Sequence, residues 1–183
     1  MAGQRLTDKT ALDQQTGSGD LYMVVDVNDT TGSAEGTTKK IDSKFVIQTD
    51  KFSLSNGEVL DLDNSEKTLV GALSGYMITP IRVTVLCTYA ASTESARKDL
   101  LFGFGDAVDT TYWSKVSDCM DGKTTDRTYI IGGFDQSKEG VWSESILNRS
   151  FVCWAEGTGF NGGWSCDIYV TYCYTKVLFN IDS

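Results

Sequence analysis

The sequence contains no histidine. This absence excludes the catalytic systems and zinc sites that depend on an imidazole, such as Ser-His-Asp triads, Cys-His pairs and His-ligated zinc. The chain also lacks a G-x-x-x-x-G-K-[ST] phosphate loop and any G-x-G-x-x-G that opens a helix. We therefore expect a protein that is not an enzyme and that carries no cofactor.

Basic residues are scarce, and apolar runs are short. Sixteen Lys and Arg stand against 25 Asp and Glu, which gives a formal net charge of -9. Nucleic-acid binding relies on Lys and Arg, and an acidic surface is repelled by anionic membranes, so we expect neither partner. No apolar run approaches the roughly 18 residues of a membrane helix. The first residues, Met1 to Asp8, have no apolar core, so we expect no signal peptide.

The five cysteines are an odd number without C-x-x-C spacing. They are Cys87, Cys119, Cys153, Cys166 and Cys173. This pattern argues against a disulfide framework and against a zinc site. It is typical of buried, reduced thiols in a chain made in a reducing cytoplasm.

The residues that are abundant favour strands and turns, with many Thr, Ser, Val and Tyr, 18 Gly and a single Pro. Apolar and polar residues alternate with period two over 82–89 and 166–175, which predicts half-buried strands. Further strands are expected at 100–104, 129–133, 141–145 and 151–156, and short helices at 94–99 and 111–120. The regular spacing predicts an all-β fold, specifically a jelly-roll-like β-sandwich.

A change in character near residue 50 predicts two parts. The apolar segment 21–27, the turn-rich segment 28–36 and the polar segment 37–41 together indicate a hairpin. Because a lone hairpin is marginally stable, residues 1–50 are interpreted as an anchor arm that needs a partner surface. Residues 51–183 are interpreted as the β-sandwich domain.

Acidic clusters leave two alternatives open. Paired carboxylates at Asp61 and Asp63, or at Glu139 and Glu144, are the kind of group that a glycosidase needs, although a solvated face is the simpler interpretation. Calcium is the second alternative, at 61–66 or at Asp26, Asn28 and Asp29. The segment 61–66 lacks the glycine and the final acidic residue of a calcium loop, and Asx residues after a strand commonly form turns.

Aromatic residues gather in and beside the glycine-rich stretch 156–164. They are Trp142, Trp154, Phe160 and Trp164. Phe160, Asn161 and Trp164 are candidate glycan contacts, because an aromatic ring in an Asn/Gly-rich loop can stack on a sugar. The alternative is that the tryptophans cap the core or fill a subunit interface, where aromatic side chains are enriched.

The segments 6–12, 19–32 and 36–41 resemble a recurring N-terminal segment of tailed-bacteriophage virion proteins. In that family, a strand of the form Asp-Leu-(apolar)-x-Val-Val-Asp is followed by a Gly-Thr-(Thr/Ser)-Lys-Lys-Ile return strand. The resemblance covers about the first quarter of the chain. It implies that this segment attaches fibres, spikes or decoration proteins to the particle. The implied attachment residues are Leu21, Tyr22, Val24, Val25, Lys39, Lys40 and Ile41.

The resemblance implies a capsid decoration protein, a short head fibre or a tail accessory protein, because the chain has no long repetitive shaft. Its partners would be capsid or tail subunits and further copies of itself, with a trimer as one arrangement. Such a protein would be assembled into the virion in the host cytoplasm. The alternative function is a carbohydrate- or receptor-binding module at a fibre tip that contacts a host surface glycan.

Overall fold

The structure is a computed structural model that describes residues 21–31, 36–42, 45–105, 112–132 and 146–176. The chain divides into two compact units, Met1–Gln48 and Thr49–Ser183.

The first unit contains an antiparallel hairpin of β1 (Leu21–Asp26) and β2 (Thr37–Asp42). Leu21 is paired with Asp42 at one end of the hairpin, and Asp26 with Thr37 at the other. The carboxylate of Asp26 accepts a hydrogen bond from the backbone N–H of Asn28, at 3.0 Å, which begins the turn after β1. Within the described residues this sheet has two strands, the least that a sheet can have.

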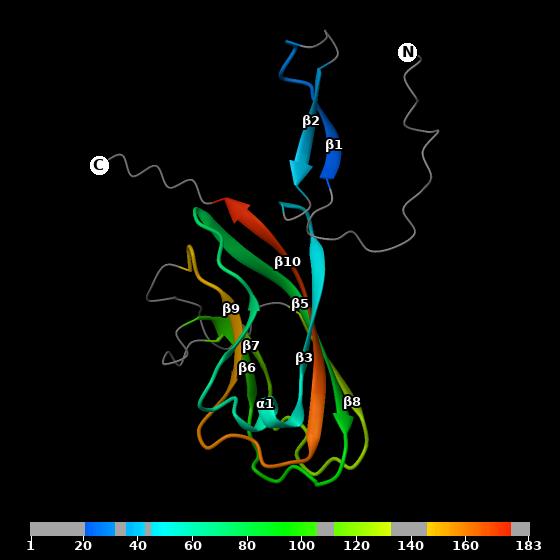
Figure 1. Ribbon diagram of the computed structural model, residues 1–183, viewed down its shortest axis with the longest axis vertical. Helices are drawn as coiled ribbons and strands as arrows, with labels where there is room; N and C mark the ends of the chain where they lie inside the picture. The colour runs from blue at the N-terminus through cyan, green and yellow to red at the C-terminus, as the bar shows by residue number, and fades with distance from the viewer. Residues whose placement is uncertain (1–20, 32–35, 43–44, 106–111, 133–145, 177–183) are drawn as a thin grey trace, which may run out of the picture. The chain divides into compact units, whose positions relative to one another are not determined.

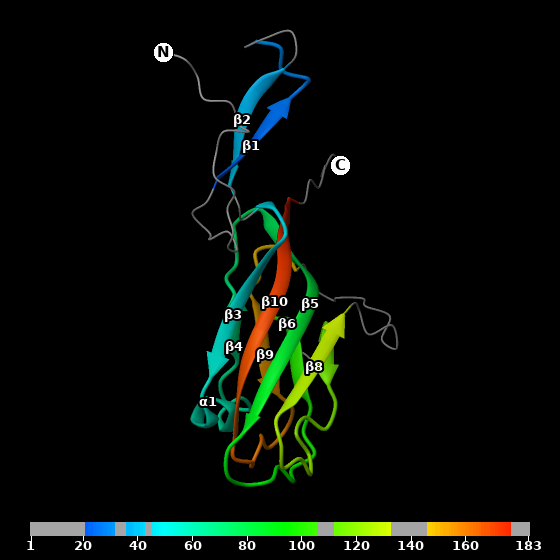
Figure 2. The same ribbon diagram turned by 90° about the vertical axis from the view of Figure 1, so that its right-hand side faces the viewer.

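The second unit contains eight strands and one short helix among its described residues. The elements are β3 (Gln48–Leu54), α1 (Asn56–Leu60), β4 (Lys67–Val70), β5 (Tyr76–Tyr89), β6 (Leu100–Phe104), β7 (Ser114–Val116), β8 (Arg127–Gly132), β9 (Phe151–Ala155) and β10 (Trp164–Lys176). They form two four-stranded sheets in the orders β3-β10-β5-β8 and β4-β9-β6-β7 (Figures 1 and 2). The all-β prediction is confirmed.

The strands of the second unit pair in a nested order. β6 pairs with β7, β5 with β8, β4 with β9, and β3 with β10, so the first strand lies beside the last. Strands β3 to β6 alternate between the two sheets, and strands β7 to β10 return along the same path. Segments far apart in the sequence are therefore neighbours throughout this unit.

The core lies between the two sheets and follows the period-two pattern. On β10 the inward residues Trp164, Cys166, Ile168, Val170 and Tyr172 are all buried. The facing sheet contributes inward residues that include Leu100, Phe102, Phe151 and Cys153. Leu101, Tyr112, Val152 and Trp154 form a smaller second cluster. All five cysteines are free, and four of them are buried.

The single proline lies where a central strand tolerates it. Pro80 is opposite Tyr172 at a bulge, where the register between β5 and β10 shifts. Pairing of β5 with β8 begins only at Arg82, so the missing N–H of Pro80 interrupts no bond to β8.

The predicted helices at 94–99 and 111–120 are wrong. Glu94 makes an isolated bridge to Asp121, and Ser114–Val116 forms strand β7. The helix that is present, α1, starts at a capping box in which Ser55 and Glu58 bond each other's backbone N–H groups. No helix among the described residues is long and apolar enough to cross a membrane. The strand expected at 141–145 lies outside the described residues.

Phe151→Ala tests this core. Phe151 is fully buried and makes edge-on contacts with Phe104 and Trp113, at ring-centroid distances of 5.5 and 5.7 Å. The substitution is expected to lower the free energy of unfolding by about 3–5 kcal/mol, because it leaves a cavity. Urea denaturation measures the change. Ile47→Ala, at a residue that is 66% exposed, is the control and should change stability by less than about 0.5 kcal/mol.

Candidate functional site

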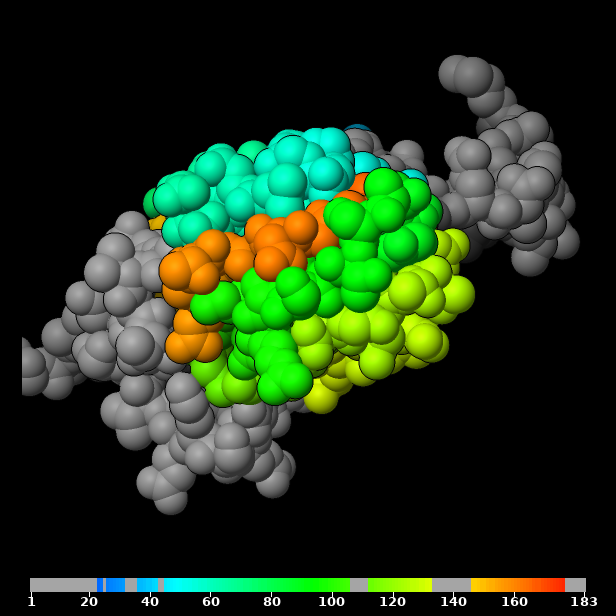
Figure 3. All heavy atoms as spheres, turned by 90° about the horizontal axis from the view of Figure 1, so that it is seen from below, coloured from blue at the N-terminus to red at the C-terminus, as the bar shows by residue number. Residues whose placement is uncertain are grey.

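Four connections meet at one end of the second unit, which we call the loop end. They link β3 to β4 (residues 55–66), β5 to β6 (90–99), β7 to β8 (117–126) and β9 to β10 (156–163). Seen from that end, the four segments lie side by side (Figure 3, cyan, green, yellow-green and orange). Loops gathered on a rigid β scaffold are a common place for binding residues.

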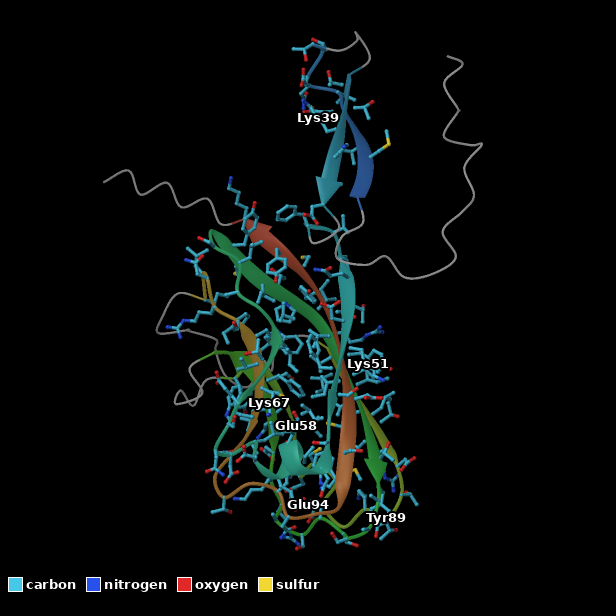
Figure 4. The ribbon with its side chains drawn as sticks, in the orientation of Figure 1. Lys39, Lys51, Glu58, Lys67, Tyr89 and Glu94 are labelled. Atoms are coloured by element: carbon cyan, nitrogen blue, oxygen red, sulfur yellow. The ribbon has the colours of Figure 1, made fainter. Side chains whose placement is uncertain are left out.

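The carboxylate of Glu94 lies at the centre of the loop end (Figure 4) and is only 1% exposed. Oε1 accepts from the backbone N–H of Ser95 at 3.1 Å and of Ala96 at 2.8 Å. Oε2 accepts from the backbone N–H of Asn161 at 3.0 Å and of Gly162 at 2.8 Å, and from Nε1 of Trp164 at 3.1 Å. Because every partner is a donor, the buried charge is compensated by hydrogen bonds.

Further bonds join all four connections. The backbone carbonyl of Glu94 accepts from the N–H of Gly122 at 2.9 Å. The Nδ2 of Asn56, in α1, donates to the carbonyls of Gly162 and Trp164, each at 2.9 Å. Glu94 thus connects the loops before β6, β8 and β10, and Asn56 adds the loop before β4.

Glycines allow the loops to come this close. A Cβ on Gly162 would lie 2.9 Å from the backbone N and Cα of Glu94, and one on Gly163 would lie 2.7 Å from the backbone N of Ser92. Gly159 has a φ of +74° and packs on the carboxylate of Asp63. The glycine-rich stretch 156–164 is therefore a packed segment of the loop end.

The predicted glycan contacts do not form an exposed aromatic platform. Phe160 is 5% and Trp164 1% exposed, and their rings pack edge to face with centroids 5.0 Å apart. Asn161 is exposed, but its Oδ1 accepts from the backbone N–H of Ser95 at 3.0 Å. Trp154 is also buried, and Trp142 lies outside the described residues. A sugar cannot stack on rings that the core covers, so the alternative interpretation as core-capping residues fits this placement.

The acidic clusters are engaged in local bonds. The Nδ2 of Asn64 donates to Asp61 at 3.4 Å and to Asp63 at 3.1 Å. Glu139 and Glu144 lie outside the described residues. In the part of the chain that the structure describes, no three or more His, Cys, Asp or Glu side chains come together in a group that could hold a metal ion.

The predicted attachment residues lie on the hairpin. Val24 is 43% exposed. Two other apolar residues of this segment, Met23 and Val27, are also exposed, at 64% and 68%. Lys39 forms an ion pair with Asp29 and, as the largest cause, lowers the pKa of that carboxyl to about 2. The other predicted residues are Lys40, which is exposed, Ile41, which is half-buried, and Leu21, Tyr22 and Val25, which belong to β1.

Glu94 is the residue that sequence reasoning missed, since it was assigned to a helix. Nothing in its neighbours along the chain identifies partners 67 to 70 positions away. The glycine pair at 162 and 163 is the one signal of a close approach, but it does not reveal what approaches. No protein-family model and no curated protein matches the chain, so its function has to be argued from its own residues.

Glu94→Gln tests the role of this carboxylate. The amide NH₂ would face backbone donors and leave at least one buried N–H without an acceptor, so stability should fall by about 3 kcal/mol. Chemical denaturation measures the loss, and hydrogen exchange should show faster exchange at Asn161 and Gly162. Glu156→Gln, at an exposed residue of the same loop, is the matched control and should leave both readouts unchanged.

Gly162→Ala tests the close approach. Its Cβ would overlap backbone atoms of Glu94 that cannot rotate away, so we expect a loss of about 1–3 kcal/mol. In Gly71→Ala the new Cβ meets nothing within 4 Å, and its stability should stay close to that of the unaltered chain. Equal melting temperatures for the two variants would contradict this account of the loop.

Proposed function

We propose that this chain is a non-enzymatic structural component of a tailed-bacteriophage particle, attached through its N-terminal arm. Capsid decoration protein, short head fibre and tail accessory protein are the forms that such a component takes. The observation that carries the proposal is the exposed apolar surface of the hairpin, where Met23, Val24 and Val27 face solvent. A two-stranded sheet is marginal by itself, and covering these side chains with a partner would stabilise it.

The second unit is proposed to be a β-sandwich of the jelly-roll type. The nested pairing of β3 with β10, β4 with β9, β5 with β8 and β6 with β7 supports this assignment. This order arises when a long antiparallel pair of chain segments is wound around a core, so that successive strand pairs lie alternately in one sheet and in the other. Jelly rolls are common in viral capsid proteins and in lectins, which agrees with a virion role.

The chain enters the second unit at the start of β3. Thr49 begins this unit, and its hydroxyl shares a hydrogen bond of 2.9 Å with Thr171. The loop end lies at the other end of the same strands, beyond Leu54 and before Trp164. The chain therefore enters the second unit at the end of β3 that lies opposite to the loop end.

Further copies of the chain are proposed as partners, with a trimer as one arrangement. The sheet β3-β10-β5-β8 has exposed apolar side chains at Ile81 and Ile130, which are 41% and 70% exposed. Packing between copies would remove this surface from water. The oxygens of Glu94 are occupied by structural hydrogen bonds, which supports a role in architecture over catalysis.

Deleting residues 1–45 should leave a folded second unit that no longer enters particles. Incorporation is measured by complementing a phage that lacks the gene and quantifying the chain in purified particles by mass spectrometry. Val24→Asp in the full chain should lower incorporation at least about tenfold, because a charge on the docking face has to be desolvated.

Thr68→Asp is the control for that experiment, because it adds the same charge at an exposed position on the other sheet of the second unit. Its incorporation should equal that of the unaltered chain. Normal incorporation of the deletion variant would overturn the attachment role of the arm.

A further inference from the structure

A hollow of about 410 Å³ lies where β3, α1, β5 and β10 meet, next to the loop end. Six of its eight lining residues are polar, and the lining comes from Ser53, Leu54, Ser55, Glu58, Thr88, Ser165, Cys166 and Asp167. We call it the Ser53–Asp167 hollow. The volume falls within the range of small-molecule sites, and none of the residues proposed above for attachment lines it.

Four of the eight lining residues carry a hydroxyl group, and two of these hydroxyls are free to bind a ligand. Thr88 on β5 and Ser165 on β10 are directly paired across the two strands. Among the described residues, neither hydroxyl has a hydrogen-bond partner, whereas Ser53 and Ser55 donate to carboxylates. Thr88 and Ser165 can therefore each donate to and accept from a bound molecule.

Two ionised carboxylates border the hollow, and each is balanced by a lysine. Asp167 accepts from the hydroxyl of Ser53 at 2.6 Å and lies 2.9 Å from the Nζ of Lys51. The hydrogen bond from Ser53, followed by that from Lys51, lowers the pKa of Asp167. Asp167 therefore stays ionised at neutral pH and acts only as an acceptor.

Glu58 repeats this arrangement on the α1 side of the hollow (Figure 4). It accepts from the backbone N–H and the hydroxyl of Ser55, at 2.9 and 2.8 Å, and lies 3.5 Å from the Nζ of Lys67. The bonds from Ser55 are the largest causes that lower the pKa of Glu58, and Lys67 adds to them. With each carboxylate matched by a lysine, the hollow favours a neutral ligand over an ion.

Apolar surface continues from the hollow onto the same face of the sheet. Leu86 is paired directly opposite Asp167 and is 37% exposed. Tyr169, two residues along β10 on the same face, has the Nζ of Lys51 at 5.9 Å from its ring centroid. A ligand held by the hydroxyls and carboxylates could rest C–H groups against these side chains.

The walls are held in place before any ligand arrives. The capping box fixes Ser55 and Glu58, and the bonds from Asn56 to the carbonyls of Gly162 and Trp164 tie α1 to the start of β10. Polar groups that are already oriented lose little entropy on binding.

We propose that the Ser53–Asp167 hollow binds a neutral saccharide. A pyranose combines hydroxyls, which match ionised carboxylates and free Ser and Thr hydroxyls, with C–H faces, which match Leu86 and Tyr169. A phosphate or other anion would meet two carboxylates, and a cation would have to displace two lysines. The site does not depend on the hairpin, so its failure would leave the particle-attachment proposal standing.

The test uses the full-length ¹⁵N-labelled chain and a panel of methyl glycosides of glucose, galactose, mannose, fucose, N-acetylglucosamine and N-acetylgalactosamine. Sialic acid and inorganic phosphate serve as anionic comparisons, and calcium as the cationic one. At least one neutral glycoside should shift the amide signals of Thr88, Ser165 and Asp167, with a dissociation constant in the range of about 1–10 mM.

Thr88→Val and Ser165→Ala should each weaken that binding roughly tenfold, because each removes one hydrogen-bonding hydroxyl. Thr68→Val removes an exposed hydroxyl from β4, in the other sheet and outside the hollow, and should bind as the unaltered chain does. The amide spectrum of each variant shows whether it is folded. Thr88→Val and Ser165→Ala test the contribution of each hydroxyl to glycoside affinity independently.

Three results would overturn the proposal. One is that no neutral glycoside shifts these amide signals at about 50 mM, well above the expected dissociation constant. Another is that binding survives both hollow variants at full strength. The third is that only sialic acid, phosphate or calcium binds there, which would assign the hollow to ions.

Discussion

The loop end depends on the compensation of one buried charge. The carboxylate of Glu94 is 1% exposed, and such a group is tolerated only where hydrogen bonds replace water. Its donors come from its own loop and from the loop before β10, and the carbonyl of the same residue holds Gly122. Because these bonds exist only when the loops are together, the carboxylate and the loop arrangement require each other. The rigid wall that α1 provides for the Ser53–Asp167 hollow rests on the same segment, through the bonds of Asn56 to Gly162 and Trp164.

The nested strand order explains why the candidate site is assembled from distant parts of the chain. β3 is paired with β10, and β10 with β5, so residues near 53, 88 and 166 become neighbours on one face. Such long-range pairing makes folding slow, since loops have to close before contacts compensate their entropy. The same long-range pairing makes the second unit a rigid scaffold that carries the four connections of the loop end. The hairpin has no comparable support among the described residues, and its apolar side chains are the reason for proposing a docking partner.

Strands could be predicted from the sequence where one face of the strand is buried and the other is exposed to solvent. The alternation along 166–175 reports which side of β10 meets the core, because a strand exposes successive side chains to opposite faces. Short helices were predicted incorrectly around Glu94 and at 111–120, where local propensity was the only guide. Ser114–Val116 is too short to show a period, and its strand conformation depends on pairing with β6. α1 carried a readable signal in Ser55 and Glu58, the two residues of its capping box.

The sequence by itself determined the all-β class and the inward faces of the long strands. These properties follow from residue types and from periods of two, which are local. Tertiary structure alone decided that Phe160 and Trp164 are covered, that Glu94 is the centre of the loop end, and that Thr88, Ser165 and Asp167 share a hollow. The physical reason is that burial and hydrogen bonding depend on what lies across a sheet or a loop. For Glu94 and Trp164 that partner is 70 residues away along the chain.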